Sequence, residues 1–139
     1  MSRNMIAGII AAVVVLVGVL VGIRLLNKDD ATQMKGAEEV TALLDGIPQK
    51  DNVLGRPSAQ VTVTEFIDFK CPVCAAASQG VVPTVIEKYV RTGKVKIELR
   101  PIAFIGPDSQ IGAVGSFAAA RQNKMWQYTE LMLRNQGPE

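Results

Sequence analysis

The chain contains two cysteines, Cys71 and Cys74, and both belong to one tetrapeptide, Cys-Pro-Val-Cys. Two thiols at this spacing can form a disulfide with each other and exchange it with other disulfides. The run before them, residues 61–69, has the composition of a strand. The run after them, residues 75–91, has the composition of a helix. A dithiol at a strand-to-helix junction is therefore the first candidate for chemistry in this chain.

The expected junction places Cys71 at the N-cap of the helix and Pro72 at its first position. Proline suits this position, because its ring presets φ and its missing N–H would be unpaired there in any case. The N–H groups of Val73 and Cys74 then point toward the sulfur of Cys71, and the helix dipole adds positive potential. Both effects favour the thiolate, so we expect a lowered pKa for Cys71. Cys71 is the predicted attacking thiol and Cys74 the resolving thiol, with Pro72 and Val73 supporting them.

Three other interpretations of the cysteines are open at the level of sequence. A structural disulfide across so short a loop would stabilise the fold by only about 2 kcal/mol on the chain-entropy estimate. Half of a zinc site is a second interpretation, but tetrahedral zinc needs four ligands, and the chain has no histidine and no third cysteine. Two buried thiols without chemistry are the third. The strand, proline and helix around the pair favour the redox dithiol, so no metal and no cofactor is predicted.

Two carboxylates near the dithiol are candidates for moving its protons. Side chains alternate along a strand, so Glu65 lies on the more apolar face of residues 61–69. If it is buried there, its pKa rises and it can shuttle the proton that Cys74 must lose and regain. The alternative is a solvated carboxylate without a role. Asp68 is closer to the cysteines but lies on the mixed face, and it is predicted as a supporting residue.

The elements that hold the dithiol follow from the pattern after it. Apolar residues recur at helical spacing up to residue 91, and Pro83 should kink this helix near Gln79 and Gly80. Residues 94–99 alternate as a half-buried strand, which completes one βαβ unit with a parallel strand pair. Two further helices are expected, over residues 106–122 and 125–135.

At this point the residues resemble a family. Residues 65–74, Glu-Phe-Ile-Asp-Phe-Lys-Cys-Pro-Val-Cys, look like the start of a DsbA-like thiol-disulfide oxidoreductase of the membrane-anchored bacterial branch. The similarity continues through residues 100–106 and 125–137 and covers about residues 47–139. It implies an α/β, thioredoxin-like fold with a helical insertion after the second strand of the βαβ unit.

The resemblance also implies roles for single residues. Cys71 would form the mixed disulfide, Cys74 would resolve it, and Glu65 would be the buried acid of the fold. Val73 stands where the best-known members have histidine, which implies a less oxidising couple. The chain stops at Glu139, before the cis-proline loop, the two further strands and the closing helix of the family. An incomplete, C-terminally truncated domain is therefore expected.

The N-terminal segment is predicted to anchor the chain in a membrane. No residue from Met5 to Ile23 is charged, and Leu25 and Leu26 extend this apolar run, which is long enough to span hydrocarbon. A cleaved signal peptide would have a shorter apolar core followed by a small-residue site. The flanking basic residues do not set the orientation. A tethered dithiol is best used where disulfides persist, so we expect the domain outside the cytoplasmic membrane.

The predicted organisation is a tail and single-pass anchor over residues 1–26, a juxtamembrane linker with a short helix over 27–46, and the thioredoxin-like domain over 47–139. A chain of 139 residues leaves room for one such domain. Its 15 basic and 13 acidic residues are scattered, so nucleic acid is not an expected partner.

The sequence thus predicts a membrane-tethered, extracytoplasmic thiol-disulfide oxidoreductase. Its expected partners are unfolded or thiol-containing secreted proteins and a redox partner in the membrane. One alternative is a reductase that serves the thiols of cytochromes or surface proteins. A second alternative, from another class, is a non-catalytic anchored interaction module whose two cysteines form a static disulfide.

Overall fold

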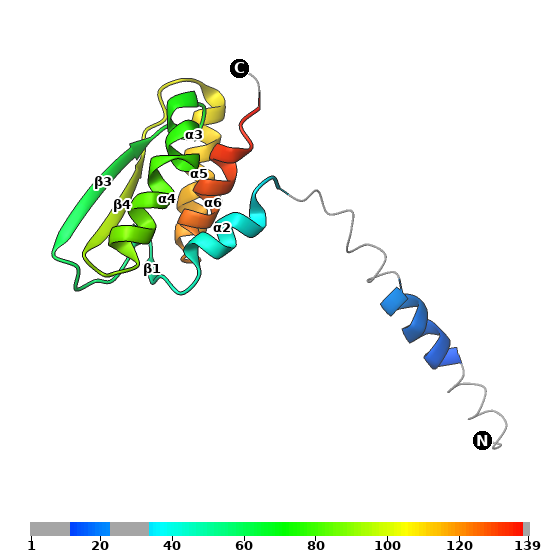
Figure 1. The fold of residues 1–139 in the computed structure, drawn as a ribbon. Coiled ribbons are helices and arrows are strands. Elements are labelled where there is room, and N and C mark those ends of the chain that lie inside the picture. Colours follow the sequence, from blue (N-terminus) through cyan, green and yellow to red (C-terminus); the bar gives the residue numbers. More distant parts are fainter. Residues whose placement is uncertain (1–11, 23–33, 138–139) are drawn as a thin grey trace. The chain divides into compact units, whose positions relative to one another are not determined.

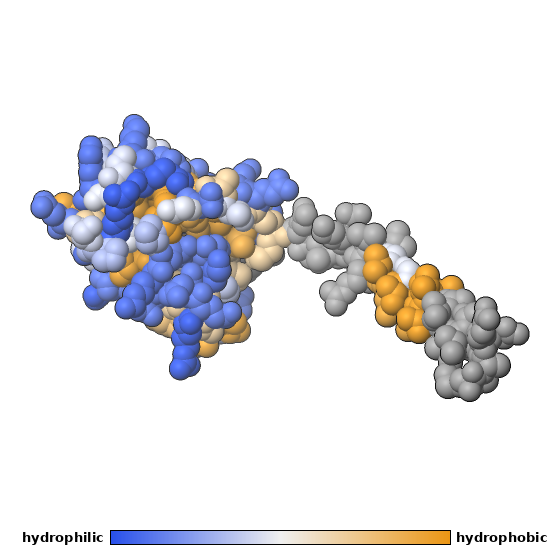
Figure 2. All heavy atoms as spheres, turned by 90° about the horizontal axis from the view of Figure 1, so that it is seen from below, coloured by the Kyte–Doolittle hydropathy of each residue, from blue (hydrophilic) through white to orange (hydrophobic). Residues whose placement is uncertain are grey.

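The computed structural model describes residues 12–22 and 34–137, and the chain divides into two compact units, Met1–Gln33 and Met34–Glu139. In the first unit, residues 12–22 are helical and largely exposed, and most of their side chains are apolar (Figure 2). The predicted anchor, residues 1–26, lies more than half outside the described residues, as do residues 27–33 of the predicted linker. Within the described stretches, no helix combines the length and the apolar character needed to cross a membrane.

The second unit is built on a sheet whose strands lie in the order β1-β2-β4-β3 (Figure 1). The short strands β1 (Gln49–Lys50) and β2 (Val53–Leu54) form an antiparallel hairpin, and β2 runs antiparallel to β4 (Val95–Pro101). The strand before the dithiol, β3 (Val61–Ile67), pairs in parallel with β4. The expected parallel strand pair is therefore confirmed, and β3 forms one edge of the sheet.

Helices cover one face of this sheet (Figure 1). In chain order they are α2 (Ala37–Leu44), α3 (Pro72–Gln79), α4 (Val81–Val85), the π-helical turn η2 (Ile86–Val90), α5 (Pro107–Ala120) and α6 (Met125–Arg134). Burial alternates along β4: Ile97 and Leu99 are each 2% exposed, whereas Glu98 between them is half-buried and Arg100 after them faces solvent. The two helices expected after the βαβ unit are confirmed as α5 and α6, and α2 packs against α6.

The helix that follows the dithiol is interrupted at Gly80. Pro83 has no N–H, so the carbonyl of Gln79 cannot receive the usual helical hydrogen bond. The N–H of Gly80 bonds instead to the carbonyl of Ala77 at 3.1 Å and ends α3, after which the chain continues as α4 and η2. The kink expected near Gln79 and Gly80 is therefore confirmed.

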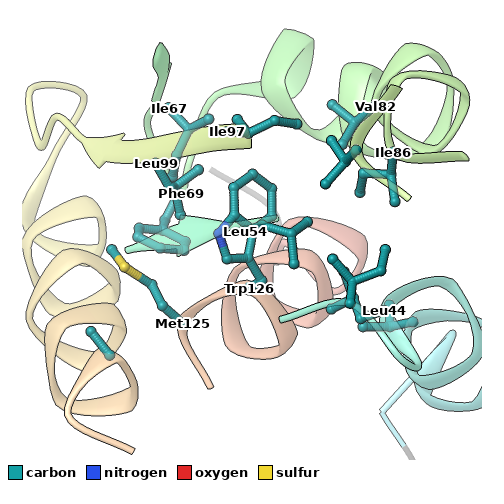
Figure 3. Packing of buried hydrophobic residues seen from close by; sticks show 14 of the residues in the cluster. Leu44, Leu54, Ile67, Phe69, Val82, Ile86, Ile97, Leu99, Met125 and Trp126 are labelled. Carbon is teal, nitrogen blue, oxygen red and sulfur yellow. The ribbon is translucent and has the colours of Figure 1, made fainter. Parts of the chain in front are cut away.

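Trp126 lies at the centre of the hydrophobic core (Figure 3). Its side chain is fully buried, and its indole N–H donates to the carbonyl of Asn52 at 3.3 Å. Leu54 of β2, Leu99 of β4 and Ile86 of η2 belong to the same cluster. Because Trp126 belongs to α6, this packing fixes α6 to the covered face of the sheet.

The apolar face of β3 is covered over only part of its length. Val61, Val63, Glu65 and Ile67 all lie on the face that the helices cover, as their alternation in the sequence predicts. Ile67 is 2% exposed, but Val61 and Val63 are 52% and 42% exposed. β3 is an edge strand, and in the described part of the chain its one sheet partner is β4. The alternation of residues therefore predicts correctly which face of β3 is turned toward the helices. How far that face is buried depends on the elements that lie beside the strand.

Candidate active site

The helix α3 begins at the dithiol. Cys71 is its N-cap, with an extended backbone, and Pro72 is its first residue. The N–H of Cys74 donates to the Sγ of Cys71 over 3.3 Å. The carbonyl of Cys71 accepts the N–H of Ala75 at 3.1 Å, which is the first hydrogen bond of the helix. The capping arrangement expected from the sequence is therefore present, and the sulfur of Cys71 takes the place of the side-chain oxygen that usually caps a helix.

The two thiols have opposite pKa shifts. The pKa of Cys71 is lowered, first by a hydrogen bond from the thiol of Cys74 and further by the N–H groups of Cys74 and Val73. Burial and the charge of Asp68 act against this shift without reversing it. Burial is the main cause that raises the pKa of Cys74 to about 11, and the charges of Cys71 and Glu65 add to it. Cys71 is thus the more readily ionised thiol, while Cys74 keeps its proton at neutral pH.

Glu65 lies on β3 beside Leu99 of β4, on the face that the helices cover. Its side chain is partly buried, and burial raises its pKa. Its charge also raises the pKa of Cys74, as the smallest of the causes that act on that thiol. That Glu65 carries the proton of Cys74 stays a prediction.

Asp68 holds together three segments of the site. It is 1% exposed, and its carboxylate accepts hydrogen bonds from the backbone N–H groups of Lys70, Phe104 and Ile105 and from the hydroxyl of Ser109. Burial alone would raise the pKa of Asp68, but these hydrogen bonds hold it below its usual value. The end of β3, the loop after β4 and the start of α5 are thus joined at one carboxylate. Asp68, which was expected on the mixed face of the strand, is thus buried and joins these segments by hydrogen bonds.

Gln136, in the segment after α6, also holds the dithiol loop by hydrogen bonds. Its side-chain amide donates to the carbonyls of Phe69 at 2.9 Å and Cys71 at 3.1 Å. The ammonium group of Lys70 donates to the carbonyl of Gly137 at 3.1 Å. The segment after α6 is therefore hydrogen-bonded to the residues just before Cys71 and to Cys71 itself. Nothing in the sequence around Gln136 points to this contact, because its two acceptors lie more than 60 residues earlier.

A second buried acid lies against α3. Glu130 of α6 is 2% exposed, and the hydroxyl of Ser78 donates to its Oε2 at 2.6 Å. Burial is the main cause that raises the pKa of Glu130 to about 7; the hydrogen bond from Ser78 lowers it and the charge of Glu65 raises it. Trp126 and Leu133, one helical turn to either side, are also buried. A glutamate at the spacing of two core residues is the sequence signal for this burial.

Apolar side chains are exposed at the same end of β3. Val73 is 74% exposed, and the loop after β4 exposes Ile102, Phe104 and Ile105 by 41%, 72% and 40%. The N–H of Ile102 bonds to the carbonyl of Ile67 at 2.7 Å, which fixes this loop beside the end of the strand. Within residues 12–22 and 34–137, no group of three or more histidine, cysteine, aspartate or glutamate side chains could hold a metal ion.

A parallel strand–helix–strand unit with a dithiol at the first turn of its helix defines the thioredoxin-like class of proteins. A family model described as thioredoxin matches residues 48–139 of this chain. The chain belongs to this family.

Similar proteins are known from bacteria. "Probable disulfide bond formation protein D" of Bacillus cereus is 39% identical over 85 residues, which cover 60% of this chain and 39% of the relative. "Na(+)/H(+) antiporter NhaA 3" of Salinispora tropica is 33% identical over 117 residues, covering 81% of this chain and 17% of the relative. The crystal structure of oxidised BdbD from Bacillus subtilis has a TM-score of 0.61 and 27% identity, and the match covers 67% of this chain and 54% of BdbD.

These matches confirm the resemblance to DsbA-like proteins and the thioredoxin-like α/β fold. The chain spans less than half the length of the curated relatives that it matches.

Proposed function

We propose that this chain is a membrane-tethered thiol-disulfide oxidoreductase that works through Cys71 and Cys74 outside the cytoplasmic membrane. One observation carries the proposal: the backbone N–H of Cys74 donates to the Sγ of Cys71 at the first turn of α3, while burial keeps Cys74 protonated. Cys71 can thereby attack, or leave, as a thiolate, whereas Cys74 stays protonated until it reacts with the mixed disulfide.

The exchange can be followed bond by bond. When the protein oxidises a client, a client thiolate attacks the Sγ of Cys71 in the Cys71–Cys74 disulfide, and Cys74 leaves with the electron pair and takes up a proton. A second client thiolate then attacks the client sulfur of the mixed disulfide, which forms the client disulfide and releases Cys71 as a thiolate. The low pKa of Cys71 makes it a good leaving group in this last step. The reverse sequence reduces a client disulfide.

Unfolded or thiol-containing secreted proteins are the proposed clients. The exposed apolar side chains of Val73, Ile102, Phe104 and Ile105 support this, because they offer contacts that need no fixed client sequence. In this proposal residues 1–26 are a single-pass anchor, a membrane redox partner restores the dithiol, and residues 47–139 carry the reaction. The exposed apolar helix over residues 12–22 supports the anchor.

A thiol reductase for cytochromes or surface proteins is the second candidate, and Val73 favours it. The isopropyl side chain of Val73 points to solvent and has no hydrogen-bond donor, so among the described residues the thiolate is stabilised by the helix N–H groups and Cys74. A less stabilised thiolate gives a more reducing couple. A reduction potential close to that of thioredoxin, about −270 mV, would select the reductase, and one near about −120 mV would select a strong oxidant.

The test compares the full chain in detergent with its Cys71→Ser variant, using insulin reduction and oxidative refolding of a reduced client as assays. We expect Cys71→Ser to abolish both activities, because the remaining thiol, Cys74, stays protonated at neutral pH and cannot form the mixed disulfide. Cys74→Ser should instead accumulate the mixed disulfide, visible as a mass increase on non-reducing analysis. Undiminished turnover by Cys71→Ser would contradict the proposal.

A further inference from the structure

One edge of β3 has no neighbouring strand among the residues that the structure describes. β3 pairs with β4 alone, and the carbonyl of Ile67 at its end accepts the N–H of Ile102, which follows β4, at 2.7 Å. In a parallel strand pair, a bonded residue turns its N–H and its carbonyl toward the partner strand, and its neighbours in the strand turn theirs away. The backbone groups of Thr62, Thr64 and Phe66 therefore point away from β4. We call these groups the open edge of β3.

The open edge is suited to pair with a further strand. Natural edge strands often prevent such pairing with proline, with lysine or with a bulge. Residues 61–67 contain neither proline nor lysine, and their pairing with β4 continues without a break from Val61 to Ile67. Val61 and Val63 are exposed on the covered face of the sheet, and Phe66 is 58% exposed on the other face. β3 lies at the margin of the sheet (Figure 1), where it offers unpaired backbone groups and apolar side chains together.

The open edge leads to the dithiol. The carbonyl of Ile67 is bonded to the segment after β4, whereas the carbonyl of the next residue, Asp68, accepts the N–H of Cys71 at 3.1 Å. A single turn therefore joins the end of the strand to the first thiol. An extended chain advances about 3.3 Å per residue, so a strand that ends beside Phe66 needs at most about five more residues to reach Cys71. A polypeptide that pairs with this edge is thus held within reach of the reacting sulfur.

We propose that the open edge of β3 binds the client polypeptide as an added β-strand and so brings a client cysteine to Cys71. An extended polypeptide presents N–H and carbonyl groups at the two-residue repeat that Thr62, Thr64 and Phe66 require. These main-chain bonds form with any client sequence, which suits clients that share no motif. The occupant is a client because the edge ends at the dithiol. The proposal rests on the proposed dithiol exchange and adds the way in which the client is bound.

The test measures how fast Cys71 reacts with a peptide disulfide, using the full chain in detergent with Cys74→Ser. The peptide is extended and soluble, and its one central cysteine is joined to thionitrobenzoate. The thiolate of Cys71 attacks the peptide sulfur, and thionitrobenzoate leaves with the electron pair as a coloured thiolate. The same disulfide of cysteine methyl ester measures the reactivity of the thiol without main-chain pairing. We expect the peptide to react at least about tenfold faster.

Two changes remove single backbone donors from the pairing. Peptides that are N-methylated at alternate residues lose either the N–H groups that face β3 or those that face solvent, so only one of the two methylated peptides should lose its rate advantage. In the protein, Thr64→Pro removes an outward N–H and leaves the pairing with β4 in place, because proline is tolerated on the open side of an edge strand. The ratio of the peptide rate to the methyl ester rate should fall about tenfold. Thr64→Val keeps the N–H and should restore this ratio.

Amide hydrogen exchange of the trapped mixed disulfide measures the pairing directly. The amides of Thr62, Thr64 and Phe66 should exchange at least about tenfold more slowly once the peptide is bound. The amides of Val63 and Glu65 are turned to β4 and should change little. Neighbouring residues of one strand thus serve as the control, without any substitution in β3.

The outcomes distinguish this inference from the proposed function. If Cys71 reacts with neither disulfide, the proposed exchange itself is wrong. If it reacts with both at similar rates, or if the amides of Thr62, Thr64 and Phe66 stay unprotected, the exchange stands and binding at the open edge is overturned. Protection of these amides before any peptide is added would show that a second copy or another segment of the chain occupies the edge, which also overturns the inference.

Discussion

Each thiol of the pair is held in its ionisation state by a different physical cause. Hydrogen bonds from the Cys74 thiol and from the first N–H groups of α3 favour the thiolate of Cys71. Burial favours the neutral thiol of Cys74. The two states are complementary, because an exchange reaction needs one sulfur that leaves easily and one that reacts only after the mixed disulfide has formed.

Asp68 is the residue on which the geometry of the dithiol loop depends most. A hydrogen bond to a charged group is worth about 1.5–3 kcal/mol, and the carboxylate of Asp68 accepts four. Asp68→Asn keeps the shape but removes the charge and turns one acceptor oxygen into a donor. We therefore expect the free energy of unfolding to fall by about 2–3 kcal/mol at pH 7, measured by urea denaturation.

The pH dependence of this loss follows from the lowered pKa of Asp68. The folded state binds the proton less readily than the unfolded state, so the contribution of Asp68 is complete above the ordinary aspartate pKa of about 4 and is lost at lower pH. The difference between wild type and Asp68→Asn should shrink between pH 7 and pH 3. Asp108→Asn, an exposed position 3.9 Å from the ammonium of Lys70, is the matched control and should change stability little. An equal loss in both variants would contradict the role given to Asp68.

At the scale of the elements, α6 and the segment after it support the dithiol as much as α3 does. Trp126 fixes α6 to the sheet, Glu130 bonds to Ser78 on α3, and Gln136 bonds to the dithiol loop. The three contacts come from one helix and the two residues that follow it. The contact with Ser78 lies near the end of α3, and the contacts of Gln136 with Phe69 and Cys71 lie at its start.

Gln136→Ala tests this support. The change removes two hydrogen bonds from the loop that contains Phe69 and Cys71, each worth about 1 kcal/mol. We expect the amide hydrogens of Cys74 and Ala75 to exchange about five to thirty times faster, because local opening of the first turn becomes easier. Amide hydrogen exchange by NMR measures this directly. Gln122→Ala, at an exposed position after α5, is the control; unchanged protection of α3 in Gln136→Ala would count against the role of α6.

The same contacts explain which parts of the site the sequence predicts. The cap of α3 depends on residues within four positions of each other, so Cys71, Pro72 and Cys74 predict it. The junction at Asp68 depends on a loop 36 or more residues later, and the contact between Ser78 and Glu130 spans 52 residues. Local patterns carry no information on such pairings. The exposure of Val61 and Val63 depends likewise on which strands lie beside β3.

At the scale of the whole molecule, the chain consists of two compact units, and the dithiol of the proposed exchange belongs to the second, Met34–Glu139. A thioredoxin-like core of strands β3 and β4 with α3 positions the dithiol, while the loop after β4 is hydrogen-bonded to Asp68 and the segment after α6 to Phe69 and Cys71. The short helix α2, expected as part of a linker, packs against α6. The thioredoxin family, the strand topology and the capped cysteine all agree with one proposed activity, disulfide exchange.

The most direct test of this account is the thiolate titration of the reduced full chain, followed by ultraviolet absorbance at 240 nm, with Cys71→Ser as the reference. The account predicts one thiol that ionises below the value of free cysteine, about 8.5, and that is lost in Cys71→Ser, and a second that ionises toward about 11. Two thiols that both ionise at or above the value of free cysteine would contradict it.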